Sequence, residues 1–219
     1  LLIACGLGSA LPRSAQADAP YVGPQPDRLG VTAPVSEALR AKLAELPVVE
    51  LDENTKGLEL SEHLAVLDDP GAEMSLAEAT SEGQAGGWVM PGTEAHEAWW
   101  GQGFPWTDQV HATWFAVRVK RGGASEAEDG GHTLVLSDNA SRQVDLFQLS
   151  DVARWQGGKG LEAPATSGTT PHRYPSFEMP EAAEGSEAEG TLLLVRSRKF
   201  SQDTHLYPLQ AWSSASWND

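Results

Sequence analysis

A series of short segments with alternating apolar and polar side chains most constrains the fold of this chain. In the segment 112–120, Thr113, Phe115, Val117 and Val119 fall on one face. A period of two is typical of a strand with one buried face. Turn residues separate these segments, including the Asp-Pro-Gly of 69–71 and the Gly-Gly of 157–158. The pattern predicts an all-β fold, a jelly-roll-type antiparallel β-sandwich of about eight strands. The segments are 64–67, 112–120, 132–137, 143–149, 174–179, 191–196 and 205–212.

Two short helices are also predicted. Between 35 and 46, leucines recur at helical spacing with charged residues on the other side, which indicates an amphipathic helix that Pro47 ends. Ser75 and Glu78 have the spacing of a capping box, with Ser75 as N-cap. The acidic stretch 181–190 has no apolar anchor and is predicted to be a solvated loop.

The first residues resemble a secretory signal segment without its basic start. An apolar run over 1–11 is followed by Ala15-Gln16-Ala17, which matches a small-residue cleavage site. The run is shorter than the roughly 20 residues that span a bilayer. Alternatively, the residues up to Cys5 resemble a lipobox, in which Cys5 would be acylated. Both alternatives predict an exported protein.

Net charge and cysteine content exclude several classes of function. The 219 residues include 15 Lys and Arg against 31 Asp and Glu, for a formal net charge of −16. Nucleic-acid binding needs clustered cations, so this balance argues against such a partner and against docking on anionic lipid. The chain has one cysteine, which excludes an internal disulfide and a cysteine-built zinc site.

Motifs of catalysis are missing from the sequence. His96-Glu97 begins like the helix of a zinc protease, but Trp100 stands where the second histidine is required. No nucleophile elbow, dinucleotide-binding glycine pattern or phosphate loop is present. The sequence predicts no enzyme activity, no cofactor and no metal, although a hydrolase with an unrecognised carboxylate pair remains a third hypothesis.

Tryptophan is the most distinctive residue, with 8 in a chain of 7% aromatics. Trp99, Trp100 and Trp106 crowd one glycine-flanked stretch, and indole faces stack well on sugar rings and other flat apolar ligands. We therefore predict these three as ligand-binding residues. The alternative is that the rings close one end of the core, as expected for Trp114 and Trp212.

An ordered set of motifs over 63–213 resembles a family of bacterial ectodomains. Leu67-Asp68-Asp69-Pro70-Gly71 with Ser75 and Glu78 is followed by strand motifs and by Tyr207-Pro208-Leu209-Gln210-Ala211-Trp212-Ser213. This order is similar to that of the type 2 extracellular domain of seven-transmembrane receptors with diverse intracellular signalling modules. Two departures are Ala116, where the family has Arg, and the lack of an apolar membrane run after Trp212. The strand motifs are Trp114-Phe115-Ala116-Val117-Arg118-Val119, Leu134-Val135-Leu136, Val144-Asp145-Leu146-Phe147, Arg173-Tyr174-Pro175-Ser176-Phe177 and Leu194-Val195-Arg196-Ser197.

The resemblance implies a jelly roll related to carbohydrate-binding modules that serves as the periplasmic input domain of a receptor. Transmembrane helices and a kinase or diguanylate cyclase output would follow, so we expect the chain to be a fragment. Its parts would be a truncated signal at 1–17, a Pro-rich linker with the short helix at 18–62, the sensor domain at 63–213 and a tail at 214–219 leading toward the membrane.

We therefore expect a non-catalytic sensor of a soluble small molecule or carbohydrate. Arg118, Arg173 and Arg196 lie in or beside matched strands, where they would form a basic pocket for carboxylate or hydroxyl groups. The alternative is that they pair with Asp145 or Glu178 at strand ends. A free-standing secreted carbohydrate-binding or adhesion module is the second functional hypothesis.

Overall fold

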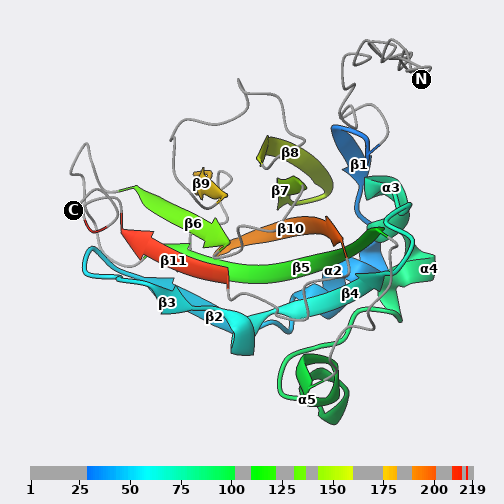
Figure 1. The fold of residues 1–219 in the computed structure, drawn as a ribbon, viewed down its shortest axis with the longest axis horizontal. Coiled ribbons are helices and arrows are strands. Elements are labelled where there is room, and N and C mark those ends of the chain that lie inside the picture. The colour runs from blue at the N-terminus through cyan, green and yellow to red at the C-terminus, as the bar shows by residue number, and fades with distance from the viewer. Residues whose placement is uncertain are drawn as a thin grey trace, which may run out of the picture.

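The fold is a sandwich of two β-sheets, and three of its short helices pack on one face of the larger sheet (Figure 1). It is seen in a computed structural model of the chain. The structure describes residues 29–101, 110–121, 131–136, 143–159, 175–181, 189–200, 209–213 and 216.

The larger sheet has the strand order β1-β8-β7-β10-β5. At its far edge β5 pairs with two strands, parallel to β2 along one half and antiparallel to β4 along the other. All other described pairings in this sheet are antiparallel. Its strands are β1 (Thr32–Pro34), β2 (Val48–Leu51), β4 (Ala65–Asp69), β5 (Val110–Arg121), β7 (Gln143–Leu149), β8 (Val152–Lys159) and β10 (Thr191–Phe200).

The smaller sheet has the order β3-β11-β6-β9 and covers one face of the larger one. Phe115 and Val117 of β5 pack toward it, in one apolar cluster with Leu134 and Leu209. This is the core between the sheets, and it explains why alternate residues of β5 are apolar. The strands of the smaller sheet are β3 (Leu58–Glu59), β6 (His132–Leu136), β9 (Ser176–Glu178) and β11 (Leu209–Ser213).

A second apolar cluster lies on the opposite face of the larger sheet. Trp114 and Ala116 of β5 point there, against Leu39 and Leu43 of α2 and against Trp88. Because both faces are covered, nearly all residues in the middle of β5 are buried, including those between the predicted inward positions. The helices are α2 (Glu37–Leu43), η1 (Ser61–His63), α3 (Leu76–Ala79), α4 (Glu82–Ala85) and α5 (Glu94–Gly101).

The all-β sandwich predicted from the sequence is confirmed, and so are the two predicted helices. Ser36 caps α2, its side chain accepting from the Leu39 amide at 3.3 Å. Ser75 and Glu78 form the predicted capping box of α3. Residues before 63 also supply strands β1, β2 and β3, so the sandwich begins within the stretch predicted as linker and helix.

The prediction of a turn at Gly157 and Gly158 was wrong, because both residues lie inside β8. A Cβ on Gly158 would come within 2.7 Å of Asp145 Oδ1, so glycine serves close approach here rather than chain reversal. Helix α5 was not predicted from the sequence, and Figure 1 shows it set apart from α2, α3 and α4.

Several predictions lie outside the described residues. They include the signal segment 1–17 with Cys5, most of the tail 214–219 and most of the acidic loop 181–190. Within the described ranges, no helix is long and apolar enough to cross a membrane.

Candidate ligand-binding site

A row of polar side chains crosses the helix-covered face of the larger sheet. Arg196 of β10 is in register with Asp145 of β7 on one side and with Trp114 of β5 on the other. All three residues are buried. Charged groups in the interior of a sandwich are rare and need partners, so this row is the first place to look for a site. We refer to Asp69, Gln143, Asp145, Trp155, Trp114 and Arg196 as the Arg196 cluster.

Arg196 is held by a turn as well as by its sheet neighbours. Its Nη2 donates to the carbonyl oxygen of Ala72 at 2.8 Å and lies 3.5 Å from Asp69 Oδ2. Its guanidinium carbon lies 5.3 Å from the ring centroid of Trp114, in cation–π geometry. Burial lowers the pKa of Arg196, and the nearby carboxylates of Asp69 and Asp145 oppose that shift.

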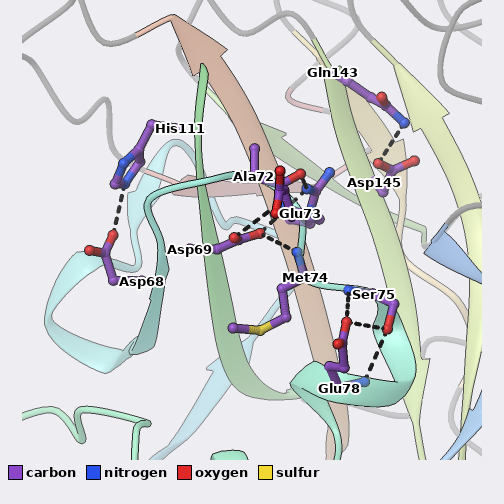
Figure 2. Close-up of polar contacts among 11 residues, drawn as sticks. Asp68, Asp69, Ala72, Glu73, Met74, Ser75, Glu78, His111, Gln143 and Asp145 are labelled. Carbon is purple, nitrogen blue, oxygen red and sulfur yellow. Dashed lines mark hydrogen bonds and ion pairs between the residues drawn. The ribbon is translucent and has the colours of Figure 1, made fainter. Parts of the chain in front are cut away.

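Asp145 is the buried carboxylate of the cluster. Its Oδ2 accepts from Gln143 Nε2 at 2.8 Å, as Figure 2 shows, and its Oδ1 accepts from Trp155 Nε1 at 3.2 Å. Burial raises the pKa of Asp145, while the bonds from Gln143 and Trp155 and the charge of Arg196 act in the opposite direction. Two neutral donors thus bind a carboxylate whose charged form is disfavoured by burial.

The turn that contacts Arg196 is organised by Asp69. Figure 2 shows the Asp69 carboxylate accepting from the amides of Glu73 and Met74, at 3.1 and 3.2 Å. Ala72, which lies between Asp69 and Glu73 in the turn, has a φ of 52°, in the left-handed region that costs a non-glycine residue about 1–2 kcal/mol. Side-chain bonds from Asp69 and Arg196 therefore hold a strained backbone in place.

Buried polar atoms in the cluster lack a hydrogen-bond partner among the described residues. They are the donors Trp114 Nε1 and Arg196 Nε and the acceptor Gln143 Oε1. A buried polar atom without a partner costs about 1–3 kcal/mol, so each one is a point where a bound molecule would gain a contact. The cluster offers both donors and an acceptor.

Trp99 and Trp100 lie on the other side of the larger sheet. Both rings are half-buried and pack on Phe115, with their own centroids 5.0 Å apart. Trp100 Nε1 donates to His96 Nε2 at 2.8 Å, and the His96 ring also hydrogen-bonds the backbone of Leu64. The pair fastens α5 to the sheet, and the polar edge of Trp100 is used inside the protein.

The predicted arginines do not share one pocket. Arg118 lies four residues along β5 from Trp114, about 13 Å away at strand spacing, and its Nη2 lies 3.4 Å from the carbonyl oxygen of Leu43 near the end of α2. A cation there stabilises the carboxyl end of a helix. Arg196 is opposite Asp145 in register, as the pairing alternative required, but its ion pair is with Asp69. Trp106 and Arg173 lie outside the described residues.

Sequence reasoning missed Asp69, Gln143 and Trp155 as members of a site. A usable signal existed in the strands themselves, because Asp145 and Arg196 each interrupt an apolar run. The contribution of Asp69 had no such signal, since Asp-Pro-Gly is ordinary turn chemistry.

Neither a metal-binding cluster nor a known relative indicates what this site binds. Among the described residues, no group of three or more His, Cys, Asp or Glu is placed to hold a metal ion. Comparisons of the chain with protein-family models, curated proteins and solved structures found no match. The functional argument therefore rests on the geometry of the chain itself.

Proposed function

We propose that this chain is the periplasmic ligand-sensing domain of a bacterial transmembrane signalling receptor. It binds a soluble small molecule, with carbohydrate as the leading class, and has no catalytic role of its own. The observation that carries the proposal is the Arg196 cluster, in which buried donors and an acceptor lack partners among the residues that the structure describes. The ordered motifs that resemble receptor ectodomains support it independently.

The chemistry of the cluster favours binding over catalysis. Arg196 and Asp145 are each held by fixed partners, and within the described ranges their side-chain hydrogen bonds go to no serine, threonine or histidine. A hydroxyl nucleophile needs an activating base within hydrogen-bond reach, and neither Arg196 nor Asp145 has a hydroxyl partner among these bonds. A rigid set of donors and acceptors next to indole rings is instead suited to recognition.

A thermal-shift screen with neutral sugars and small organic acids tests the proposal. A ligand that binds the folded state raises the melting temperature by mass action, and the stabilisation grows with the logarithm of the ligand concentration over its Kd. Stabilisation by at least one compound, without chemical change of that compound, supports a sensor. Turnover of the compound would overturn the non-catalytic part, and no stabilisation by any compound would count against the function itself.

The second candidate is a free-standing secreted carbohydrate-binding or adhesion module. Trp99 and Trp100 on α5 favour it, because both rings stay partly exposed although they pack on Phe115, and an exposed indole face can stack on a sugar ring. Retention on insoluble polysaccharide that is lost on Trp99→Ala would support this candidate. The coding sequence beyond Asp219 separates the two, since apolar stretches of about 20 residues are expected only for the receptor.

A further inference from the structure

The turn 70–74 lies against the buried guanidinium of Arg196. Ala72 contributes the carbonyl oxygen that Arg196 Nη2 binds, while Pro70, Gly71 and Glu73 are exposed to solvent. The side chain of Arg196 is 3% exposed. A single layer of turn residues therefore separates part of the Arg196 cluster from the surface.

Apart from the partly buried side chain of Met74, which packs on the helix-covered apolar cluster, this turn is held by polar contacts. The amide of Ala72 donates to the carbonyl oxygen of Asp69 at 2.9 Å, and the amides of Glu73 and Met74 donate to the Asp69 carboxylate. Ala72 is the one described non-glycine residue with a positive φ. Segments with few apolar contacts and strained backbone open locally at lower free energy than core strands do. The turn is thus built to open without disturbing the sheets.

The charges of the cluster indicate what kind of ligand fits beneath the turn. Arg196 lies near both Asp69 and Asp145, and Arg198 lies near Asp145, so the formal charges of these four side chains cancel. A buried ligand with a net charge would leave one charge without compensation in a medium of low dielectric constant. A neutral ligand avoids that penalty.

The unpartnered atoms narrow the ligand further. Trp114 Nε1 and Arg196 Nε offer protons, while Gln143 Oε1 accepts one. A hydroxyl group both donates and accepts, so neighbouring hydroxyls on one small molecule match this mixed set. The indole rings of Trp114 and Trp155 supply apolar surface for the C–H face of such a molecule.

We propose that the turn 70–74 is the lid of a binding site at the Arg196 cluster, and that a neutral polyhydroxylated ligand displaces the Ala72 carbonyl from Arg196. This inference rests on the proposed function and gives it a location, a ligand class and a moving part. Because α3 begins directly after the turn, release of Ala72 is passed on to the helix-covered face of the sandwich.

Amide hydrogen exchange during a sugar screen tests the lid. The probes are neutral monosaccharides, each paired with its own uronic acid, such as glucose with glucuronic acid. We expect a neutral sugar to stabilise the protein and to speed exchange at the amides of Ala72, Glu73 and Met74. The Glu78 amide, which donates to Ser75 Oγ at 3.3 Å, is the internal control and should not change.

A conservative variant and its matched control test whether the ligand contacts Trp114, and a third variant tests the turn. Trp114→Phe keeps a ring but removes the unpartnered donor, and it should weaken binding of the stabilising sugar by roughly two- to ten-fold. Trp88→Phe is the matched control, because Trp88 is equally buried in the same apolar cluster but its Nε1 already donates to the Ala79 carbonyl at 3.3 Å. It should leave sugar affinity unchanged. Ala72→Gly relieves the strain of the closed turn and should weaken binding by about two- to five-fold.

The outcomes separate this inference from the proposed function. If a sugar stabilises the protein but the turn amides keep their protection, or Trp114→Phe binds it as well as wild type, the lid and its site are wrong while the sensor function stands. Equal binding of the uronic acids would overturn the neutral ligand class. If no compound of the screen stabilises the protein, both proposals fail, and the unpartnered atoms are satisfied by water alone.

Discussion

Arg196 Nη2 donates to the carbonyl oxygen of Ala72 at 2.8 Å and so binds the described non-glycine residue that has a left-handed backbone. The two residues are far apart in the chain, and the bond joins a central strand of the larger sheet to a surface turn. One side chain therefore connects the buried charge cluster with the segment that covers it. Variants in and around this cluster, and at α5, should change the stability of the protein as follows.

Ala72→Gly should increase the free energy of unfolding by about 0.5–1 kcal/mol. Glycine adopts a positive φ without steric cost, so the relief of strain outweighs the extra entropy of the unfolded chain. Urea unfolding followed by tryptophan fluorescence measures the change. Ala77→Gly, at an exposed position in α3, is the control and should shift stability the other way by about 0.5–1 kcal/mol. A loss of stability in both variants would refute strain at Ala72.

Gly158→Ala should destabilise the protein by about 1–3 kcal/mol. The new Cβ would lie 2.7 Å from Asp145 Oδ1 and 3.4 Å from the Trp155 ring, so the carboxylate would have to move in a packed region. Gly86→Ala is the matched control, since a Cβ at Gly86 meets nothing within 4 Å. Thermal unfolding of both variants checks the contrast. Equal melting temperatures would mean that β8 does not press on Asp145.

Arg196→Met should cost about 3–5 kcal/mol of stability, because it leaves Asp69 buried without its ion-pair partner and Asp145 with only one of its two nearby cations. Methionine keeps much of the packing volume, so the loss reports mainly on charge. Arg118→Met removes one longer contact to the end of α2 and should cost only about 1 kcal/mol. Chemical denaturation of the two variants distinguishes a buried ion-pair residue from a helix-end residue. Similar losses would contradict this distinction.

The free energy of unfolding should depend on pH through the carboxyl group of Asp145. Its pKa is raised in the folded protein by burial, so its carboxyl group favours folding at low pH, and this contribution is lost as pH rises through the folded-state pKa. Asp145→Asn stays neutral and can still accept from Trp155. The stability of wild type relative to Asp145→Asn should therefore fall as pH rises from about 4, the unfolded value. A difference that does not vary with pH would exclude the raised pKa.

His96 should make the attachment of α5 depend on pH in the opposite sense. Burial lowers the pKa of His96, whose Nε2 accepts from Trp100 Nε1. The neutral ring therefore contributes stability above its unfolded pKa of about 6.5, and this is lost as pH falls through the lower folded value. Tryptophan fluorescence should change over that range in wild type but not in His96→Phe. His63→Gln is the control and should keep the transition. If His63→Gln loses the fluorescence transition, the transition does not come from His96.

Much of the architecture was predictable because its causes are local. The segment around Phe115 places apolar residues at alternate positions, those around Leu134 and Leu193 are short apolar runs, and each forms a strand. The capping box of Ser75 and Glu78 needs only its own four residues. The strand β8 was missed because Gly157 and Gly158 resemble a turn, and only Asp145 on the neighbouring strand gives the close approach that requires glycine at 158.

The candidate site was less predictable. Arg196 was named from the sequence, but with Arg118, which the structure places near the end of α2. Phe115 and Trp114 are adjacent in sequence and point to opposite faces of the sheet, so the indoles of α5 and the Arg196 cluster lie on different sides. Side chains of adjacent residues in a strand point to opposite faces of the sheet, so neighbours in sequence do not share a site.

The sequence by itself determined the all-β sandwich, the two short helices and the excess of negative charge. Each follows from a local pattern of apolar, capping or ionisable residues, which acts over a few positions of the chain. Only the tertiary structure decided that Arg196, Asp145 and Asp69 meet beneath the turn of Ala72. Strand register and the covering of both sheet faces bring these residues together, and both arise from long-range packing that a one-dimensional pattern does not encode.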